Sequence, residues 1–375
     1  MKVSLISDNL QKKILFVNHA ISTRSQLPTL LNFLIEAKEG KLKISATDLE
    51  IGITTETTAK TEEEGETTVP AKTFVELIGM IPSGKITLET TTEGLLLKGE
   101  NEENVFQTTP TDDFPKLYED KGQHLMTLNK ETLGKDFSKV VFAASPDSER
   151  PALSGVLVKS EKDGFLLVAT DGYRLSLKKH GLQSAKKKQT EDVSLIVPSR
   201  VVRELVQMEK DVEAGDVDVF VSKEKNQIIF FQGDTTLIGR LIEAEFPNYE
   251  KIIPADFSTK TIFDKDALQK AIKAAYVFAR QTAGIIKLSI QKNKIIISAN
   301  APSVGKNQIE VEAKTTGEEN EIAFNARYLL DFLANTDSET VSFEMNGPLN
   351  PGVFKEIDDP SFMHLIMPIR VQEGN

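Results

Sequence analysis

VPAKTFVELI (residues 69–78), VPSRVVRELV (197–206) and FNARYLLDFL (324–333) are three copies of one amphipathic pattern, and they align without gaps. The apolar positions that all three copies share are Phe74, Val202 and Leu329, followed by Leu77, Leu205 and Phe332. Apolar residues three apart are typical of a helix that packs one face on a core. The sequence therefore predicts the same helix three times.

A second helical pattern precedes each copy. It reads LQKKILFVNHAIS from Leu10, LGKDFSKVVFAAS from Leu133 and LQKAIKAAYVFAR from Leu268. Each carries apolar residues at steps of four, three and four, which form the buried stripe of a helix. The stripes are Leu10, Ile14, Val17 and Ile21; Leu133, Phe137, Val140 and Ala144; and Leu268, Ile272, Ala275 and Ala279.

Corresponding points recur at roughly 125 to 130 residues, the size of one small domain. Strand-like runs such as LKISATD, FLLVATD and KIIISAN separate the two helices of each copy. We therefore predict an α+β chain of three tandem domains, each with two helices packed on antiparallel sheet. The predicted domains are residues 1–121, 122–253 and 254–375.

Local signals refine this prediction. Pro70 and Pro198 fit the first turn of a helix, where the missing N–H costs nothing. The Thr- and Glu-rich run TTETTAKTEEEGETT predicts an exposed hairpin with an acidic turn at Gly65.

Composition excludes several classes of protein. The chain has no cysteine, so disulfides and thiolate catalysis are excluded, and its four histidines have no ligand-like spacing. No apolar run reaches the length of a membrane span. We expect a cytoplasmic protein without metal or cofactor. The net charge of −11 opposes generally basic nucleic-acid binding, unless one surface is locally basic.

The repeats place cations at equivalent helical positions. Each first helix carries a lysine two residues after its opening leucine, and each second helix carries a cation near its amino terminus. These residues are Lys12, Lys135 and Lys270, and Lys72, Arg200 and Arg327. Further cations on the same helices are Lys13, Lys139, Arg203, Lys273 and Arg280. Any one of them could simply pair with acids such as Glu76 or Glu204, but the set favours a shared basic surface that binds phosphates without reading sequence.

ATDGYRL, residues 169–175, invites a catalytic interpretation because it gathers an acid, a phenol and a cation. Catalysis would require partner residues at plausible spacing, and the sequence has none. The first and third copies read ATDLEIGI and SANAPSVG, so the Asp or Asn is predicted to form a turn and Gly172 to adopt positive φ. Only the middle copy carries Gly-Tyr-Arg, which indicates a function specific to that copy.

The carboxyl-terminal run FMHLIMPIR allows two interpretations. It is either a last core strand or one wall of an apolar groove. Together with the Gly-Tyr-Arg turn, it favours a peptide-binding pocket over a reaction centre.

The triplication, ATDGYRL, EFPNYEKIIP, FNARYLLDFL and the terminal MPIR together resemble the bacterial sliding clamps, the β subunits of DNA polymerase III, over the full chain. The resemblance implies a noncatalytic processivity factor, a head-to-tail homodimer whose six domains form a ring around double-stranded DNA. It implies partners that dock a short motif between the second and third domains: the replicative polymerase, the clamp loader and other clamp-binding proteins.

The resemblance also implies site residues. The peptide pocket would comprise Leu153, Thr170, Gly172, Tyr173, Arg174, Leu175, Pro247, Lys251, Ile252, Asn325, Tyr328, Leu349, Met367, Pro368, Ile369 and Arg370. Tyr173 stands where the family often has histidine, and Lys251 where it often has arginine, which removes a bidentate fork. Arg24 matches a DNA contact, and the dimer seam would bring Phe106 near Tyr276 and Val277.

Two other hypotheses stay open at this point. The Asp171, Tyr173 and Arg174 cluster would suit a hydrolase with its site on the middle domain. A repeat scaffold that binds only proteins would also explain the triplication, and it would show no salt-sensitive association with DNA.

Overall fold

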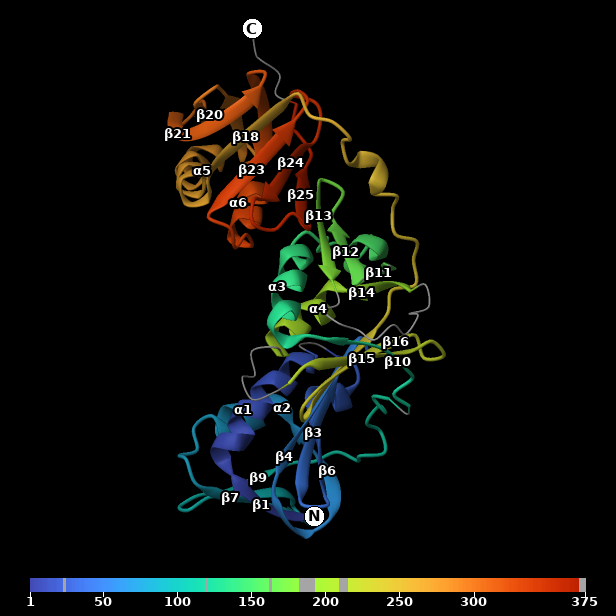
Figure 1. The fold of residues 1–375 in the computed structure, drawn as a ribbon. Coiled ribbons are helices and arrows are strands. Elements are labelled where there is room, and N and C mark those ends of the chain that lie inside the picture. Colours follow the sequence, from blue (N-terminus) through green and yellow to red (C-terminus); the bar gives the residue numbers. More distant parts are fainter. Residues whose placement is uncertain (23–24, 119, 162–163, 182–192, 209–214, 371–375) are drawn as a thin grey trace. The chain divides into compact units, whose positions relative to one another are not determined.

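The computed structural model describes residues 1–22, 25–118, 120–161, 164–181, 193–208 and 215–370 (Figure 1). These residues form helices and antiparallel strands, which confirms the α+β class. The chain divides into two compact units. Unit 1 contains Met1–Gly134 and Arg200–Leu241, and unit 2 contains Lys135–Ser199 and Ile242–Asn375.

The helices lie where the repeats predict them. The α-helices are α1 (Ser7–Val17), α2 (Ala71–Ile78), α3 (Lys130–Val141), α4 (Ser199–Met208), α5 (Lys265–Ala279) and α6 (Ala326–Ala334). The short 3-10 helices are η1 (Asn18–Ala20), η2 (Pro28–Leu31), η3 (Pro151–Leu153) and η4 (Glu250–Ile252). The predicted stripes are buried, except that Ile21 lies beyond η1 and Leu77 is half-buried.

Unit 1 holds two sheets. The five-stranded sheet has the order β5 (Lys60–Glu63), β1 (Lys2–Ile6), β7 (Lys85–Thr91), β8 (Gly94–Lys98), β9 (Glu103–Phe106). The eight-stranded sheet has the order β10 (Gln123–Leu128), β15 (Val217–Ser222), β16 (Gln227–Gln232), β17 (Thr235–Arg240), β4 (Ile51–Thr58), β3 (Lys41–Thr47), β2 (Asn32–Lys38), β6 (Gly65–Pro70). Because β17 pairs with β4, the first and second repeats share one sheet.

Unit 2 holds one twelve-stranded sheet. Its order is β14 (Ser194–Pro198), β11 (Gly155–Glu161), β12 (Gly164–Thr170), β13 (Arg174–Gly181), β25 (Phe362–Ile366), β24 (Gly352–Glu356), β23 (Thr340–Met345), β18 (Thr259–Asp264), β21 (Gly305–Gly317), β20 (Lys294–Ala301), β19 (Ile285–Ile290), β22 (Asn320–Asn325). Here β13 of the second repeat pairs with β25 of the third, with Arg174 opposite Ile366.

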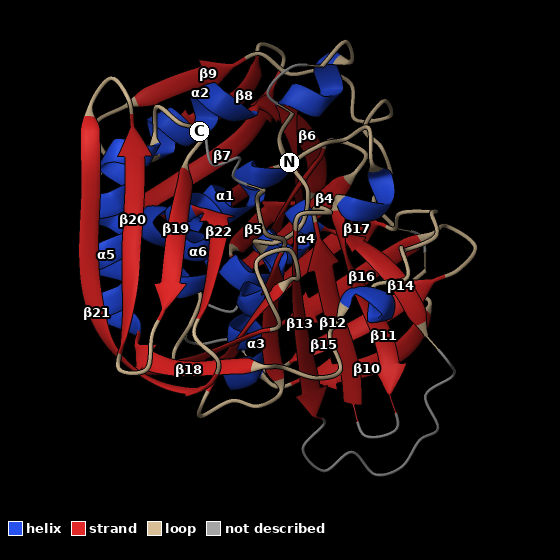
Figure 2. Ribbon diagram, turned by 90° about the horizontal axis from the view of Figure 1, so that it is seen from above, coloured by secondary structure: helices blue, strands red, loops and turns tan. Residues whose placement is uncertain are grey.

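Helices and sheet form layers within unit 2. Figure 2 shows α5 behind β19–β21, and α5 packs against these strands and against α6. The core between them is rich in phenylalanine, and the rings of Phe343 and Phe354 stack with centroids 4.6 Å apart. Burying one such ring fully stabilises the fold by about 1.5–3 kcal/mol. The helices are therefore held by tertiary packing more than by intrinsic propensity.

Three local predictions were wrong. Pro70 and Pro198 do not lie in a helical turn; they are the last residues of β6 and β14, where a residue without an N–H ends the ladder. The acidic segment is not a hairpin, since β5 pairs with β1 and β6 with β2, so the chain changes sheet there. Asn300 forms no turn; it lies in β20 opposite Lys306.

No described helix combines the length and apolar character that crossing a membrane requires.

Candidate functional site

The chain turns between β12 and β13 through three residues, and side chains close the turn. The Oγ1 of Thr170 donates to the carbonyl oxygen of Arg174 (2.6 Å) and accepts from the amide of Gly172 (3.0 Å). The Oδ1 of Asp171 accepts from the amides of Tyr173 (2.9 Å) and Arg174 (3.0 Å). Gly172 has φ of +90°, as predicted. Asp171 is thus committed to the turn, which leaves it poorly placed to act as a general base.

Arg174 links this turn to two helices. Its side chain is almost buried, with Nε 3.0 Å from Asp171 Oδ2 and Nη1 2.6 Å from Asp331 Oδ2 of α6. Its Nη2 donates to the carbonyl oxygen of Phe142, just after α3 (2.9 Å). The guanidinium also lies 4.7 Å from the ring centroid of Tyr328. Arg174 therefore supports the site from inside the protein, and three of its side-chain nitrogens already donate hydrogen bonds within the chain.

Two tyrosines differ in exposure beside Arg174. Tyr328, on α6, is half-buried, and burial together with the nearby charge of Asp171 raises the pKa of its phenol. It is therefore a neutral hydrogen-bond donor at physiological pH. Tyr173 is 58% exposed at the tip of the turn, available to a bound partner.

Two backbone hydrogen bonds anchor the carboxyl-terminal tail, one to this turn and one to β22. The amide of Met367 donates to the carbonyl oxygen of Tyr173 (2.8 Å), and the amide of Ile369 donates to that of Ala323 in β22 (2.8 Å). Both interpretations of the tail hold in part. Residues 362–366 form a core strand, and residues 367–369 continue as a half-buried segment.

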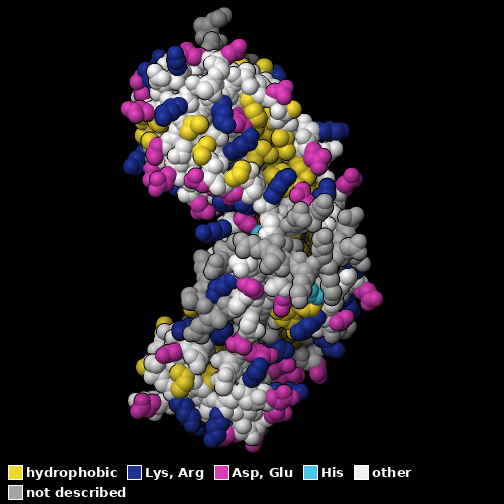
Figure 3. All heavy atoms as spheres, in the orientation of Figure 1, with side chains coloured by type: hydrophobic (Ala, Val, Ile, Leu, Met, Phe, Trp, Pro, Cys, Tyr) yellow, Lys and Arg dark blue, Asp and Glu magenta, His cyan; other side chains and the backbone are white. Residues whose placement is uncertain are grey.

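An apolar cluster lies beneath the turn and the tail. Leu175, Val353 and Leu365 are fully buried in it, and Met367 and Phe246 pack against it partly exposed. Hydrophobic side chains also gather on the face of unit 2 that Figure 3 shows. The partly exposed Met367 and Phe246 supply apolar contact area, while the adjacent turn supplies polar groups that fix orientation.

The remaining predicted pocket residues lie on several elements of unit 2. Leu153 in η3 and Pro368 are half-buried, whereas Pro247, Lys251, Ile252, Leu349 and Arg370 are exposed. Asn325 caps α6, its Oδ1 accepting from the amide of Arg327 (2.9 Å). The structure thus joins the 170–175 turn, Tyr328 and the tail by direct contacts. Leu349 lies apart from these contacts, in the loop between β23 and β24.

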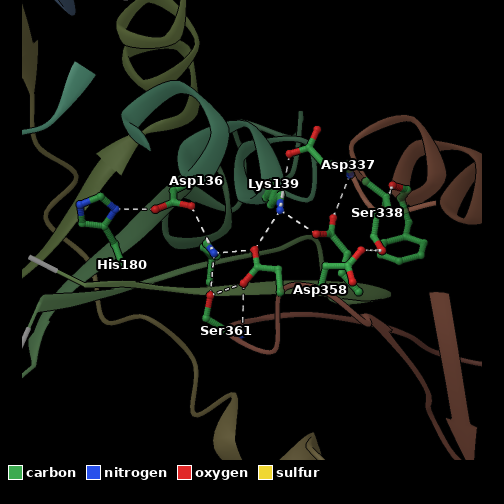
Figure 4. Close-up of polar contacts among 12 residues, drawn as sticks. Asp136, Lys139, His180, Asp337, Ser338, Asp358 and Ser361 are labelled. Carbon is green, nitrogen blue, oxygen red and sulfur yellow. Dashed lines mark hydrogen bonds and ion pairs between the residues drawn. The ribbon is translucent and has the colours of Figure 1, made fainter. Parts of the chain in front are cut away.

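A buried polar network ties α3 and β13 to the third repeat (Figure 4). The Nζ of Lys139 lies 2.8 Å from Glu356 and 2.9 Å from Asp359, and the Nζ of Lys178 lies 2.6 Å from Asp359. Asp136 completes it, 3.2 Å from Lys178 and hydrogen-bonded to His180. The assignment of Lys139 to the basic helical surface was therefore wrong: carboxylates that are remote in sequence neutralise it inside the protein.

The network shifts two pKa values. Burial disfavours the charge of Asp359, but hydrogen bonds from Lys178, Ser361 and Lys139 outweigh it and hold the pKa of this carboxyl far below its usual value. Burial likewise opposes the charge of Lys139, yet its bonds to Glu356 and Asp359 raise the pKa of its ammonium. Both groups stay charged across the physiological range.

The predicted DNA-facing cations fall into three groups. Lys12, Lys72, Lys135, Arg203, Lys270 and Arg327 are exposed on their helices. Arg200 is half-exposed and engaged: its Nη1 pairs with Asp48, and its Nη2 donates to the carbonyl oxygen of His19 (2.9 Å). Arg24 lies outside the described residues.

The predicted dimer residues also differ in environment. Phe106 is 7% exposed in β9, its ring edge-on to Phe74 at 5.3 Å, so its side chain belongs to the core of unit 1. Val277 is 54% exposed on α5. Tyr276 is half-buried, and its hydroxyl accepts from Arg327 Nε (2.9 Å).

Sequence reasoning missed several residues that build the site. Asp331 lies in the second helix of the third repeat, and nothing in the sequence indicated that it would meet Arg174. Lys178 and Asp359 carried no signal, because their contact spans 181 positions. Among the described residues, no group of three or more His, Asp or Glu is arranged to hold a metal ion.

Family models match most of the chain in three consecutive pieces. They are the N-terminal, central and C-terminal domains of the DNA polymerase III beta subunit, matched at residues 1–118, 127–248 and 250–370. The chain belongs to this family. It is therefore built of three tandem clamp domains, and the family is that of the noncatalytic sliding clamp of DNA polymerase III.

Individual clamps agree. The beta sliding clamp of Staphylococcus aureus is 30% identical over 363 residues, 94% of each chain, and that of Synechococcus elongatus is 29% identical over 377 residues, 99% of this chain and 100% of its own. The solved sliding clamp of Bacillus subtilis has a TM-score of 0.93 at 25% identity, and that of Pseudomonas aeruginosa bound to griselimycin has 0.92 at 25%. Both structural matches cover 99% of this chain and 100% of the other.

Proposed function

We propose that this clamp encircles double-stranded DNA without sequence preference and tethers the replicative polymerase in the cytoplasm. The observation that carries this is the recurrence of one exposed lysine at the same position of each first helix: Lys12, Lys135 and Lys270. A lysine that recurs in each repeat suits the phosphate backbone of DNA, whose negative charge recurs at regular spacing. Contacts to phosphates position a protein on DNA without reading the bases.

The ring would be a head-to-tail dimer of domains 1–121, 122–253 and 254–375. A head-to-tail contact needs two different surfaces on each copy. The end strand β9 of unit 1 is one candidate. The other is the first part of β21, which pairs with β20 up to Glu312 and with β18 only from Ala313 onward. Of the three predicted residues of the dimer seam, we retain Phe106 and Val277, because the hydroxyl of Tyr276 is engaged by Arg327.

Partner peptides would bind across the turn, the tail and the apolar cluster. Leu175 and Met367 offer apolar contact, while Tyr173, Tyr328 and Asn325 offer polar groups. A related clamp has been solved with griselimycin bound, so a clamp of this fold accepts a ligand. The polymerase, the clamp loader and other motif-bearing proteins would compete for one site.

Retention on DNA tests the clamp function. After loading, the protein should stay on nicked circular duplex and leave the same duplex once it is linearised, because only a closed track prevents sliding off. A strictly monomeric protein, retained equally on both DNAs, would overturn the proposal. Turnover of a substrate that Asp171→Asn abolishes would favour the hydrolase, and DNA association insensitive to salt and to charge reversal of Arg200 and Arg203 would favour the protein scaffold.

Peptide affinity tests the pocket. We expect Arg174→Ala, and separately deletion from Met367 onward, to weaken binding of a peptide with Gln-Leu and a terminal Leu-Phe pair while the dimer persists. Lys314→Ala, an exposed change on β21, serves as the control and should leave affinity unchanged. Wild-type affinity in both pocket variants would contradict the assignment.

A further inference from the structure

Tyr276 joins two arginines at the corner between α5 and α6. Its hydroxyl accepts from Arg327 Nε at 2.9 Å, and the guanidinium carbon of Arg280 lies 5.4 Å from its ring centroid. Arg280 follows the last residue of α5, and Arg327 is the second residue of α6. One half-buried tyrosine therefore orders two exposed guanidinium groups from different helices.

The electrostatic setting of this pair differs from that of the other arginines described above. Arg174 is neutralised by Asp171 and Asp331, and Arg200 by Asp48. Within the described part of the chain, no carboxylate lies within 4.0 Å of a guanidinium nitrogen of Arg280 or Arg327 to form such a pair.

The end of a helix also matters for each cation. Arg327 lies at the positive end of α6, where a cation is disfavoured, whereas Arg280 lies at the favourable end of α5. The hydrogen bond to Tyr276 holds Arg327 in this disfavoured place. Hydroxyl acceptors leave the charge of a guanidinium intact, so the corner presents two positive charges.

The corner continues a line of cations along α5. Lys270 and Lys273 lie on its exposed face and the exposed Arg280 directly follows its last residue, while Leu268, Ile272, Ala275 and Ala279 are buried on the other face. The line spans about 15 Å at 1.5 Å per residue. A row of this length suits a ligand with regularly repeated negative charge, such as a nucleic-acid backbone, better than one carboxylate of a peptide.

We propose that Arg280 and Arg327, ordered by Tyr276, form a phosphate site at which the backbone of the encircled duplex binds. The inference rests on the proposed clamp function and assigns Tyr276 to DNA positioning in place of the dimer seam. Planar guanidinium groups bind phosphate oxygens in a forked geometry, and fixing them in advance reduces the entropy lost on binding. Tyr276 is a positioning residue, since it acts on DNA through the arginines.

The test measures association of the full-length protein with a short fluorescent duplex over a series of salt concentrations. Arg280→Gln with Arg327→Gln should lower the slope of log K against log salt by about 1.8, because each lost phosphate contact on duplex accounts for about 0.9. The matched control is Lys292→Gln with Lys314→Gln, which removes two exposed charges from the strand side of the third domain and should leave the slope unchanged.

Tyr276→Phe isolates the positioning role, because it removes only the hydroxyl. Losing one hydrogen bond should weaken association about two- to tenfold without changing the salt slope. The effect should vanish when Arg327 is already Gln and persist when Arg280 is Gln. Arg327→Lys should restore the slope, but it should remove most sensitivity to Tyr276→Phe because lysine lacks the Nε donor.

Three outcomes would overturn the inference. One is an unchanged salt slope in the double arginine variant while the wild-type protein is still retained on nicked circular DNA. Another is dissociation of the dimer by Tyr276→Phe, which would return this residue to the seam. The third is loss of peptide affinity with unchanged DNA association, which would assign the arginines to partner proteins. Failure of wild-type retention would instead refute the clamp function itself.

Discussion

The turn at residues 47–51 and the turn at residues 170–174 have the same hydrogen bonds but bind different partners. Thr47 Oγ1 donates to the carbonyl oxygen of Ile51, and Asp48 Oδ1 accepts two amides, as Thr170 and Asp171 do in the second turn. Leu49 has φ of +78°, where the second turn has glycine. The repeat therefore conserves the turn's geometry within this chain while its chemistry diverges.

The arginines that pair with the two turn carboxylates show what diverged. Asp48 pairs with Arg200 from α4, whose side chain is 42% exposed. Asp171 pairs with Arg174 from its own turn, which is 10% exposed and reaches Asp331 of α6. A charge pair in water contributes little, whereas removing one partner of a buried pair is costly. The same turn geometry thus supports two ion-pair junctions. We call the Asp48–Arg200 pair, whose arginine contacts water, the wet junction, and the Asp171–Arg174–Asp331 group, whose arginine is buried, the dry junction.

Breaking the dry junction should have the largest effect. Arg174→Ala leaves the buried Oδ2 of Asp171 and the Phe142 carbonyl without the guanidinium donors and removes the pair with the half-exposed Asp331. We therefore expect unit 2 to lose about 3–5 kcal/mol of unfolding free energy. This loss is measured by denaturant unfolding, monitored through hydrogen exchange of the amides in β13 and β25. Arg174→Lys should recover only part of it because it lacks the fork. A loss below about 1 kcal/mol would show that the junction is not dry.

Acid should weaken the same junction through His364. This side chain is fully buried between the rings of Phe142 and Phe332, with Nδ1 2.7 Å from Ser176 Oγ. Burial, and then the charge of Arg174, hold the pKa of His364 well below its usual value.

The sign of the pH dependence follows from that shift. In the unfolded chain His364 takes up a proton near pH 6.5, whereas in the folded chain it stays neutral at that pH. The free energy of unfolding therefore has its full value above pH 6.5 and falls as the pH drops below it, by up to about 1.4 kcal/mol per pH unit. His364→Phe should flatten the curve of unfolding free energy against pH below 6.5. Asp359 adds a loss only below about pH 4, because its folded pKa is depressed from the usual carboxyl value. An unchanged curve in the variant would contradict the assignment.

Exchanging the turn residues sharpens the comparison further. A Cβ on Gly172 would meet only Arg150 Nη1, at 3.8 Å, so the cost of Gly172→Ala is conformational, about 1–2 kcal/mol. Leu49→Gly should stabilise unit 1 by up to about 1 kcal/mol, because glycine accepts its positive φ. Thermal unfolding compares the two, and effects of the same sign would refute a common turn geometry.

Breaking the wet junction should have the smallest effect. Arg200→Ala removes a half-exposed pair with Asp48, so we expect a loss of about 0–1 kcal/mol that shrinks with added salt. Unfolding of Arg200→Ala, Asp48→Ala and the double variant gives the coupling energy. A coupling above about 2 kcal/mol would mean that the water around the half-exposed Arg200 does not weaken its pair with Asp48.

The helices, the repeat and the turn at Gly172 could be predicted from sequence because each depends on neighbours in the chain. The failures were non-local. The acidic segment near Gly65 alternates like a hairpin, but its two strands find β1 and β2 as partners. Lys139 looks like any helical surface lysine until Glu356 and Asp359 come from more than two hundred positions away.

The sequence by itself determined the α+β class, the two helices of each repeat and the turn at Gly172, since periodicity and turn chemistry are local properties. The pocket residues followed from resemblance to a family and stay a prediction. Tertiary structure alone decided which charged side chains are neutralised inside the protein and which stay exposed to a ligand. It buried Arg174 and Lys139 against remote carboxylates and set Arg280 and Arg327 around one tyrosine. A charge's effect depends on the water and partners around it, and only the folded chain brings those together.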